Sequence, residues 1–258
     1  MNLDFHVHGL LTKKSKFDEA LFLQGIEVAK EQGLNGYILC EHFNAKYIDE
    51  IHEYLETNHE YTGDKYIIND FSVFIGMEVD IKNGGHVIVA GNRENIYKMK
   101  EELKDYMVKP DFIDFEKLLN LGEANNCLMV GSHPYRDSHK LFLQPKELLC
   151  RLHGLDLNST DIGHRGLREV EMQVKTLSQE IKVPYVTGSD SHFPIQLGSV
   201  MTKFKEDFNT VEEIKRAMSE ENYEIYVSKA LDLKVFSAKT TKRVLKEELT
   251  KKEILKIG

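Results

Sequence analysis

Short runs of Val, Ile, Phe and Tyr alternate along this chain with segments whose apolar residues recur three and four positions apart. Runs of the first kind are typical of strands, and the longer spacing is typical of amphipathic helices. We predict strands at 3–7, 36–40, 73–77, 86–90, 127–131, 168–172 and 184–188, with an eighth candidate at 199–204. Eight strands separated by helices are compatible with an α/β barrel.

The amphipathic segments predict helices at 17–32, 47–57, 96–106, 112–125, 144–153, 173–181 and 211–220. The first ends at Gly33, a typical residue for the end of a helix. Asp111, and Asn209 or Thr210, are expected as N-caps. Because the chain shows no repeat and no linker, we predict one domain. A mostly parallel sheet of this length usually closes into a barrel or forms a doubly wound sheet.

The C-terminal part of the chain differs in charge from the rest. Residues 228–258 hold nine Lys or Arg against four Asp or Glu, which gives +5 and leaves −13 on the remainder of a chain whose net charge is −8. Apolar positions at Val244, Leu245, Leu249, Ile254 and Leu255 suggest a helix with one side packed on the body. We therefore expect a barrel core at about 1–227 and a basic helical extension at about 228–258. A solvated surface is the favoured interpretation of the basic face, and a contact with a partner or nucleic acid is the alternative.

Composition narrows the class of protein. The chain has 258 residues, 41% of them hydrophobic and 29% charged, as in an average soluble globular protein. Cys40, Cys127 and Cys150 form neither a CxxC pair nor an even set, which favours a reducing, cytoplasmic location without disulfides. We expect no signal peptide and no membrane span. The acidic balance makes nucleic acid an unlikely main partner, and the oligomeric state is left open.

The placement of the histidines carries the strongest functional signal. Six of the 11 lie at or beside predicted strand ends: His6, His8, His42, His86, His133 and His192. The carboxyl ends of parallel barrel strands converge on one face, so these imidazoles can meet in one pocket, although His86 begins its strand. His6 and His8 are two residues apart, which places both rings on one side of a strand.

Two carboxylates follow apolar strands in the same way. Glu78 comes after VFIGM and Asp190 after VTGS. Neutral imidazoles with ionised carboxylates are the ligand set of catalytic Zn, Mn or Fe. Two or three such ions about 3.5–4 Å apart can clamp the attacking and leaving oxygens of a phosphoryl transfer.

In this order, the motifs resemble the polymerase and histidinol phosphatase (PHP) superfamily of metal-dependent phosphoesterases. The HxH motif of that family is His6 and His8, its DH motif corresponds to Glu41 and His42, and its GxE acid is Glu78. The less fixed histidine is assigned to His86, the HP motif is His133 and Pro134, and the closing DxH is Asp190 and His192. The resemblance covers residues 4 to about 200.

The resemblance implies a distorted (β/α)7 barrel of the TIM-like type that binds two or three divalent ions, Zn, Mn or Fe. One ion would be held by His6, His8, Glu78 and Asp190. Glu78 would bridge to a second ion held by His86 and His133, and a third would take His42 and His192.

One position departs from the family pattern. The family supplies another His or Asp five to seven residues after HxH, where this chain has LLTKKSK with Lys13 and Lys14. Either the chain holds two ions and a lysine ammonium replaces the charge of the third, or Glu41, water or Asp18 completes the third site. We favour the lysine, because an ammonium can also bind a phosphate oxygen.

These features predict a cytoplasmic phosphatase, similar to histidinol phosphatase, that cleaves a phosphomonoester of a small metabolite with metal-activated hydroxide. Asp190 and His192 are expected to orient or deprotonate water, and Arg136 and Lys14 to bind phosphate. Arg165 and Arg168 are weaker candidates, and Glu171, placed on a late strand, is expected to support a histidine ring. The alternatives are a nuclease or phosphodiesterase acting on nucleic-acid ends, and a metal-binding regulatory module with little turnover.

The remaining histidines and Cys40 have weaker signals. We expect residues 137–167, with His139, His153 and His164, to contribute to a cap over the site. His52 and His59 are assigned to the surface, and Cys40 is expected to be a buried, inert thiol.

Overall fold

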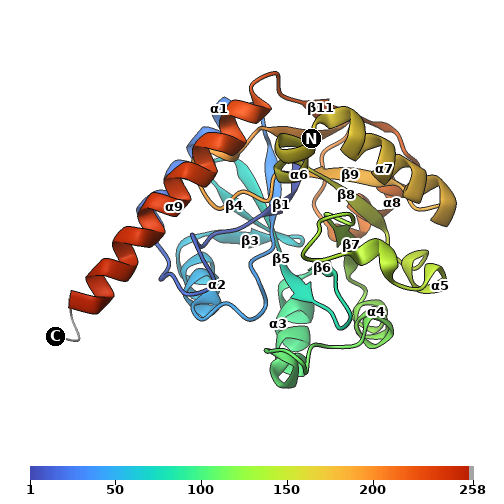
Figure 1. Cartoon of the computed structure of the whole chain (residues 1–258), viewed down its shortest axis with the longest axis horizontal. Helices are drawn as coiled ribbons and strands as arrows, with labels where there is room; N and C mark the ends of the chain where they lie inside the picture. The colour runs from blue at the N-terminus through green and yellow to red at the C-terminus, as the bar shows by residue number, and fades with distance from the viewer. Residues whose placement is uncertain (256–258) are drawn as a thin grey trace.

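The computed structural model describes residues 1–255, with side chains through residue 248, and its main sheet curls into a nearly closed barrel (Figure 1). The barrel strands are β1 (Asn2–Val7), β2 (Gly36–Leu39), β5 (Phe71–Asp80), β6 (His86–Ala90), β7 (Leu128–Ser132), β8 (Gly154–Asn158) and β9 (Tyr185–Gly188), paired in that order. A parallel bridge between Val7 and Ser191 brings β1 back to the end of β9. The predicted distorted TIM-like barrel is thereby confirmed.

The distortion comes from β6. The pairs β1–β2, β2–β5, β7–β8 and β8–β9 are parallel, whereas β6 pairs antiparallel with both β5 and β7. Only residues 81–85 connect β5 to β6, and a parallel neighbour needs a crossover of a dozen residues or more. A short turn therefore reverses one strand of an otherwise parallel barrel.

Four further strands extend this sheet. β10 (Val200–Phe204) pairs antiparallel with β1, and β11 (Tyr223–Val227) pairs with β10. The hairpin of β3 (Glu60–Thr62) and β4 (Lys65–Ile68) is attached to β5. Among the predicted strands, 168–172 is wrong, because these residues belong to helix α7 (Leu167–Ile181).

Most predicted helices are present. They are α1 (Glu19–Glu31), α2 (Ile48–Asn58), α3 (Arg93–Glu102), α4 (Phe115–Ala124) and α8 (Val211–Ser219). Thr210 and Glu213 form a complete capping box at α8, which confirms one of the two expected caps there. The expected cap at Asp111 is wrong, since α4 begins after Asp114. The predicted helix at 144–153 shrinks to α5 (Lys146–Leu149), because the chain turns there to enter β8.

Two apolar clusters separate the inside of the barrel from its helical coat. The inner cluster includes Phe74, Ile88 and Val130 from three adjacent strands, and Ile214 and Met218 of α8 close it. The outer cluster packs the other strand faces against the helices. Because inward positions alternate along each strand, the apolar inner residues lead directly to polar ones near one end of the barrel.

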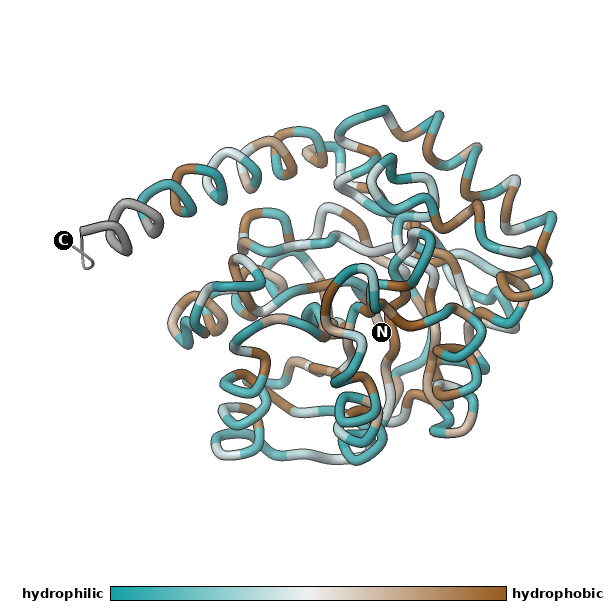
Figure 2. The backbone as a smooth tube through the Cα atoms, turned by 60° about the horizontal axis from the view of Figure 1, so that its bottom comes forward, coloured by the Kyte–Doolittle hydropathy of each residue, from teal (hydrophilic) through white to brown (hydrophobic). Residues whose placement is uncertain are grey.

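The C-terminal extension forms helix α9 (Leu231–Leu255). Leu231, Val235 and Ala238 are buried against the body, whereas the later turns project beyond it (Figure 2). The expected apolar positions Leu249, Ile254 and Leu255 lie outside the residues whose side chains are described. Within residues 1–255, no helix combines the length and the apolar character needed to cross a membrane.

Candidate metal centre

The six histidines predicted from strand ends lie in one cluster, and four of them, His42, His86, His133 and His192, line its pocket. Five of the six follow or end a strand, whereas His86 begins β6. The reversed direction of β6 resolves this exception, because the start of an antiparallel strand lies beside the carboxyl ends of its neighbours. The register places His86 opposite Asp80 at the end of β5 and opposite Ser132 at the end of β7.

An irregularity in β1 turns its two histidines toward the interior. The pairing with β2 shifts register between Asp4 and Val7. Phe5 belongs to the inner apolar cluster and Val7 to the outer one, so the sense of alternation changes between them. Bulges of this kind re-aim side chains near functional sites. His6 and His8 are consequently buried side by side, with their Nε2 atoms 3.1 Å apart.

Glu78 is the common neighbour of these imidazoles. Its Oε1 lies 2.8 Å from His86 Nδ1, 3.0 Å from His133 Nε2 and 3.4 Å from His6 Nε2. Its Oε2 lies 3.0 Å from His42 Nδ1 and 3.6 Å from His8 Nε2. The carboxyl is 1% exposed, and although burial alone would raise its pKa, the surrounding imidazoles hold the pKa well below its usual range. Glu78 is therefore an anionic centre shared by both halves of the cluster.

Asp190 and His192 complete the cluster from the loop after β9. Asp190 Oδ1 lies 3.3 Å from His8 Nε2 and 3.6 Å from His6 Nε2. The His192 ring stacks on that of His8, with centroids 4.0 Å apart. Asp190 has φ 56° and His133 has φ 30°, a backbone region that costs energy for residues other than glycine. Such local strain clusters at functional sites.

Several buried groups orient the rings from behind. His6 Nδ1 donates to Asp156 Oδ2 on β8 at 3.0 Å, and His192 Nδ1 donates to the Leu10 carbonyl at 2.8 Å. His8 Nδ1 lies 3.4 Å from Glu41 Oε1. Each contact leaves the opposite Nε2 directed at the cluster, as in metal-binding histidines whose second nitrogen is held by a carboxylate or carbonyl.

Asp156 replaces Glu171 in the supporting role expected from the sequence. Glu171 lies on helix α7 outside the barrel, so the prediction that it belongs to a late strand is wrong. The late strand is β8, whose sequence GLDLN was not predicted as a strand. Asp156 is fully buried, and its Oδ2 also accepts from Asn158 Nδ2 at 2.8 Å.

Two more potential ligands, Asp80 and His139, were missed. Asp80 Oδ1 lies 2.9 Å from His86 Nε2, and the His139 ring lies 3.8 Å from that of His86. Among the described residues, the donor atoms of four groups lie close enough together to share an ion. These groups are His8 with His42 and His192, His6 with His8 and Asp190, His6 with Glu78 and His133, and Asp80 with His86 and His139. Asp80 follows Glu78 by two residues on one strand, a spacing that places both on the same face.

The two lysines after HxH have different environments. Lys13 lines the pocket, and its Nζ donates to Asp80 Oδ2 at 2.9 Å. Lys14 is exposed and lies outside the residues that line the pocket. Asp18 caps α1 by accepting from Leu21 N, and Glu41 accepts from Leu10 N and His42 N. Lys13 is thus the lysine that the fold brings to the cluster.

Arg136 lines the same pocket but is already held by other groups. Its Nε donates to Asp161 Oδ1 at 2.8 Å, its Nη1 to Asp190 Oδ2 at 2.7 Å and its Nη2 to Asn158 Oδ1 at 2.9 Å. The guanidinium therefore fixes the orientation of Asp190, and it faces the pocket as part of that ion pair. Arg165 contacts Asp161 and Gln173, and Arg168 is exposed on α7.

The predictions for the cap, for the remaining histidines and for Cys40 are confirmed only in part. Residues 137–167 do not form a cap as a whole, because they include barrel strand β8 and helix α6 (Ser159–Arg165), although His139 lines the pocket. His52 is buried against Tyr97, so its assignment to the surface is wrong, and His59 is half-buried. Cys40 is buried, as expected, and burial raises the pKa of its thiol.

The residues of the cluster fit divalent metal ions. Ring nitrogens His8 Nδ1, His42 Nδ1 and His86 Nε2 are buried and make no well-aligned hydrogen bond within the described residues. His6 Nε2 and His8 Nε2 face each other, an arrangement that a shared cation satisfies better than a single proton does. Imidazole and carboxylate donors suit Zn, Mn and Fe, and no thiolate takes part.

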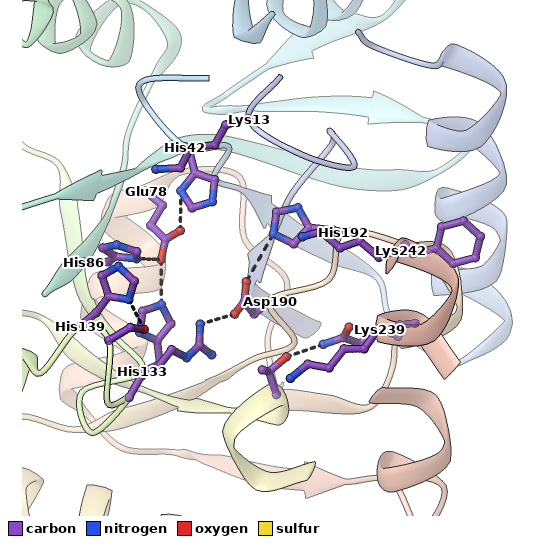
Figure 3. A pocket seen from close by; sticks show the side chains of 16 residues that line it. Lys13, His42, Glu78, His86, His133, His139, Asp190, His192, Lys239 and Lys242 are labelled. Carbon is purple, nitrogen blue, oxygen red and sulfur yellow. Dashed lines mark hydrogen bonds and ion pairs between the residues drawn. The ribbon is translucent and has the colours of Figure 1, made fainter. Parts of the chain in front are cut away.

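Glu78, Asp190 and five histidines, among them His139, line a pocket of about 370 Å³. In Figure 3, Glu78, His86, His133 and His139 lie on one side of the pocket, Asp190 and His192 lie in the middle, and Lys239 and Lys242 approach from the opposite side. A pocket of this size, with convergent polar groups, is typical of a small-ligand site.

Comparisons with known proteins give one family and a set of similar folds. A family model described as PHP-associated matches residues 171–223, which include Asp190 and His192. A search of curated protein sequences finds no match. The crystal structure of PsfC from Pseudomonas syringae PB-5123 superposes with a TM-score of 0.79 at 19% identity, covering 95% of this chain and 98% of that one.

The lesion-specific endonuclease PfuEndoQ from Pyrococcus furiosus superposes with a TM-score of 0.64 at 18% identity, covering 87% of this chain and 57% of that one. Endonuclease Q in complex with a 27-mer duplex substrate that carries an abasic lesion gives a TM-score of 0.62 at 17% identity, covering 85% and 56%. At these identities, the likeness is one of fold. The comparisons thus show a match to the PHP-associated family model over residues 171–223 and a fold similar to those of PsfC and PfuEndoQ.

Proposed function

We propose that this chain is a metal-dependent phosphoesterase that hydrolyses a phosphomonoester of a small metabolite. The observation that carries the proposal is the position of Glu78, whose two carboxylate oxygens each face imidazoles from different strands. The cluster opens into a pocket of about 370 Å³, large enough for a small phosphorylated molecule.

The proposed ligands divide into overlapping sets. His6, His8 and Asp190, with Glu78 beside them, would hold one ion. Glu78 and His133, with His86 2.8 Å from Glu78, would hold a second. His42 and His192, with His8 nearby, are the residues available to a third. When bound, such ions polarise phosphoryl oxygens and lower the pKa of water from about 16 to near 7.

Side chains around the cluster orient the groups that take part in the proposed reaction. Arg136 holds Asp190 through Oδ2, so that Oδ1 stays directed at His6 and His8. Because His192 Nδ1 donates to Leu10, its Nε2 points toward the cluster, 3.9 Å from Asp190 Oδ1. Burial lowers the pKa of His192, so the ring stays neutral and can bind a cation or accept a proton from water. Lys13, fixed by Asp80, is the lysine we assign to the missing early ligand, in place of Lys14.

A nuclease is the second candidate, and the fold it shares with PfuEndoQ favours it. Its active site would have to admit a nucleic-acid strand. Helix α9 lies along the pocket and contributes three of its lining residues, Ala238, Lys239 and Lys242, which leaves more room for a small molecule than for a duplex. A small phosphomonoester is therefore the preferred substrate class.

A substrate screen tests the proposal. Purified protein loaded with Mn, Zn or Fe is assayed for phosphate release from a panel of small phosphomonoesters and for cleavage of single-stranded and duplex DNA. We expect release from small esters, loss of release in His8→Ala, and retention in the matched variant His59→Ala outside the cluster. Cleavage of DNA without release from esters would favour the nuclease. Tight metal binding without either activity would favour a regulatory module.

A further inference from the structure

The first turns of α9 are fixed to the rim of the pocket. Lys234 Nζ donates to the Leu197 carbonyl at 2.9 Å and approaches the Ile195 carbonyl at 3.4 Å, in and just after the 3₁₀ turn that follows His192. On the other side, α9 packs closely on α6, where a Cβ added to Gly163 would lie 2.9 Å from Val235 Cγ1. This attachment gives the next turn of α9 a defined position over the pocket.

That next turn places two lysines in the pocket wall. Lys239 and Lys242 line the pocket, and Figure 3 shows them on the side away from Glu78, His86 and His139. They are three residues apart, a spacing that puts both on one face of a helix. Lys242 is half-buried, and burial lowers its pKa to about 8. Asp190 and Glu41 act on this ammonium from a distance, but no carboxylate among the described side chains pairs with it, so a bound anion would stabilise it.

These lysines differ from the other cations of the pocket. Lys13 is paired with Asp80, and Arg136 with Asp161 and Asp190. Among the residues whose side chains are described, neither Lys239 nor Lys242 has a carboxylate within ion-pair distance. Lys239 Nζ contacts the His164 imidazole instead. The pocket therefore has its paired cations beside Asp80 and Asp190 and its unpaired lysines on α9, away from Glu78.

We propose that Lys239 and Lys242 form a second anion subsite, so that the substrate is a small molecule with two anionic groups, one at the histidine cluster and one at α9. This inference rests on the proposed phosphoesterase function and specifies its substrate class. The second group is a carboxylate or another phosphate on the part of the substrate that leaves with the ester oxygen. The acidic body of the protein, with a charge of −13 outside residues 228–258, makes these two cations necessary for such a ligand.

A matched pair of substrates tests the subsite. 3-Phosphoglycerate and glycerol 1-phosphate differ in that the first has a carboxylate where the second has a hydroxymethyl group. We expect the full-length, metal-loaded protein to have the lower KM for 3-phosphoglycerate. The variant Lys239→Met/Lys242→Met should raise that KM by about tenfold or more, as expected for lost charge-assisted hydrogen bonds. Its KM for glycerol 1-phosphate should rise much less, so the ratio of the two KM values measures the subsite.

Two control variants accompany this test. Arg243→Met removes an exposed cation from the same helix that lines a different depression, and it should leave both KM values unchanged. Lys239→Arg/Lys242→Arg should restore the preference for the carboxylate. An equal rise of KM for both esters would overturn the proposal, because it would place the lysines on the transferred phosphate. An unchanged preference in the Met variant would overturn it as well.

Calorimetry separates this proposal from the proposed function. Binding of 3-phosphoglycerate to the metal-free protein is compared between the wild type and the double Met variant. If neither ester is hydrolysed but the wild type binds 3-phosphoglycerate at least about tenfold more tightly than the variant, the subsite stands and the phosphoesterase function fails. Equal binding by the two proteins would overturn the subsite whatever the outcome of the activity assay.

Discussion

His6 and Asp156 are joined by a hydrogen bond of 3.0 Å that links the first barrel strand to β8, 150 residues later in the chain. Because Asp156 Oδ2 also accepts from Asn158, the carboxylate is fixed on two sides. The ring of His6 is thereby held with Nε2 toward Glu78 and His8. The position of this imidazole is set by residues that lie outside the sequence motifs.

The first prediction concerns this pair. Asp156→Asn keeps the shape of the side chain but removes the charge that fixes the imidazole, so metal affinity should fall about 10–100-fold. Titration of the metal-free protein with Zn or Mn measures the change. Asp114→Asn, an exposed change at the start of α4, should leave the affinity intact. An Asp156 variant with wild-type affinity would show that the hydrogen bond does not orient a ligand.

Removal of the metal should reveal the role of Glu78. Metal added at about 100 times its dissociation constant stabilises a protein by about 2.7 kcal/mol. We therefore expect a chelator to lower the melting temperature of the wild type, and Glu78→Gln to lose that response because the shared carboxylate is gone. Differential scanning calorimetry with and without metal makes the comparison, with Glu53→Gln on the exposed face of α2 as the control. An undiminished metal response in Glu78→Gln would contradict its central position.

Lys13 should limit the number of ions. If its ammonium replaces the charge of a third cation, elemental analysis of the wild type should give two tightly bound ions per chain. Lys13→Met should raise KM for a phosphate ester by about tenfold through the loss of a charge-assisted contact. Lys14→Met, at the exposed neighbour, should behave as the wild type. Three tightly bound ions in the wild type would contradict this assignment.

His52 should make the protein sensitive to acid. Burial lowers its pKa to about 4, from 6.5 in an unfolded chain. The unfolded state therefore binds the proton first, so the free energy of unfolding is unaffected above pH 6.5 and falls as the pH drops from 6.5 to 4. Between pH 7 and pH 5, this single group should cost about 2 kcal/mol.

Urea unfolding at these two pH values tests the role of His52. The variant His52→Leu should lose about 2 kcal/mol less than the wild type over the same interval. Other acid-sensitive groups are common to both proteins and cancel in the comparison. Parallel losses in the two proteins would show that His52 is not the group responsible.

Gly188 should not tolerate a side chain. A Cβ there would lie 2.4 Å from His6 Cβ and 2.7 Å from Asp156 Oδ1. Gly188→Ala should therefore reduce the free energy of unfolding by about 1–3 kcal/mol, the usual cost of overpacking. Gly25→Ala in α1 is the matched control, because its Cβ would meet only Leu197 and Pro194, both at ordinary van der Waals distances. It should raise stability by about 0.5–1 kcal/mol. Denaturant titration measures both, and a neutral Gly188→Ala would contradict the close approach.

The sequence predicts strands and helices correctly where the apolar residues of a segment all repeat on one of its faces. The prediction for β6 matches the observed strand, and the cap of α8 follows from Thr210 and Glu213. The segment at 168–172 shows why alternation alone misleads. EVEM at 169–172 alternates over four residues. Val170, Val174, Leu177 and Ile181 nevertheless repeat at helical spacing and are buried on one face of α7, which has 15 residues.

Parts of the site depended on information that local sequence does not hold. Asp156 was missed because its strand is short and alternates only two leucines with polar residues, and its importance comes from a contact with His6 across 150 positions. The burial of His52 had a signal that was overlooked, since it lies with Ile48, Ile51 and Leu55 on the apolar side of α2. The direction of β6, which explains His86, follows from the brevity of the turn before it.

The closure of the barrel through β1 has a consequence for the order of folding. His6 and His8 lie far from Ser191 and β10 in the sequence, yet these later segments must pair with β1 before the two histidines are enclosed. Long-range pairing of this kind slows folding. The histidine cluster is therefore expected to assemble late, as one of the last parts of the barrel to close.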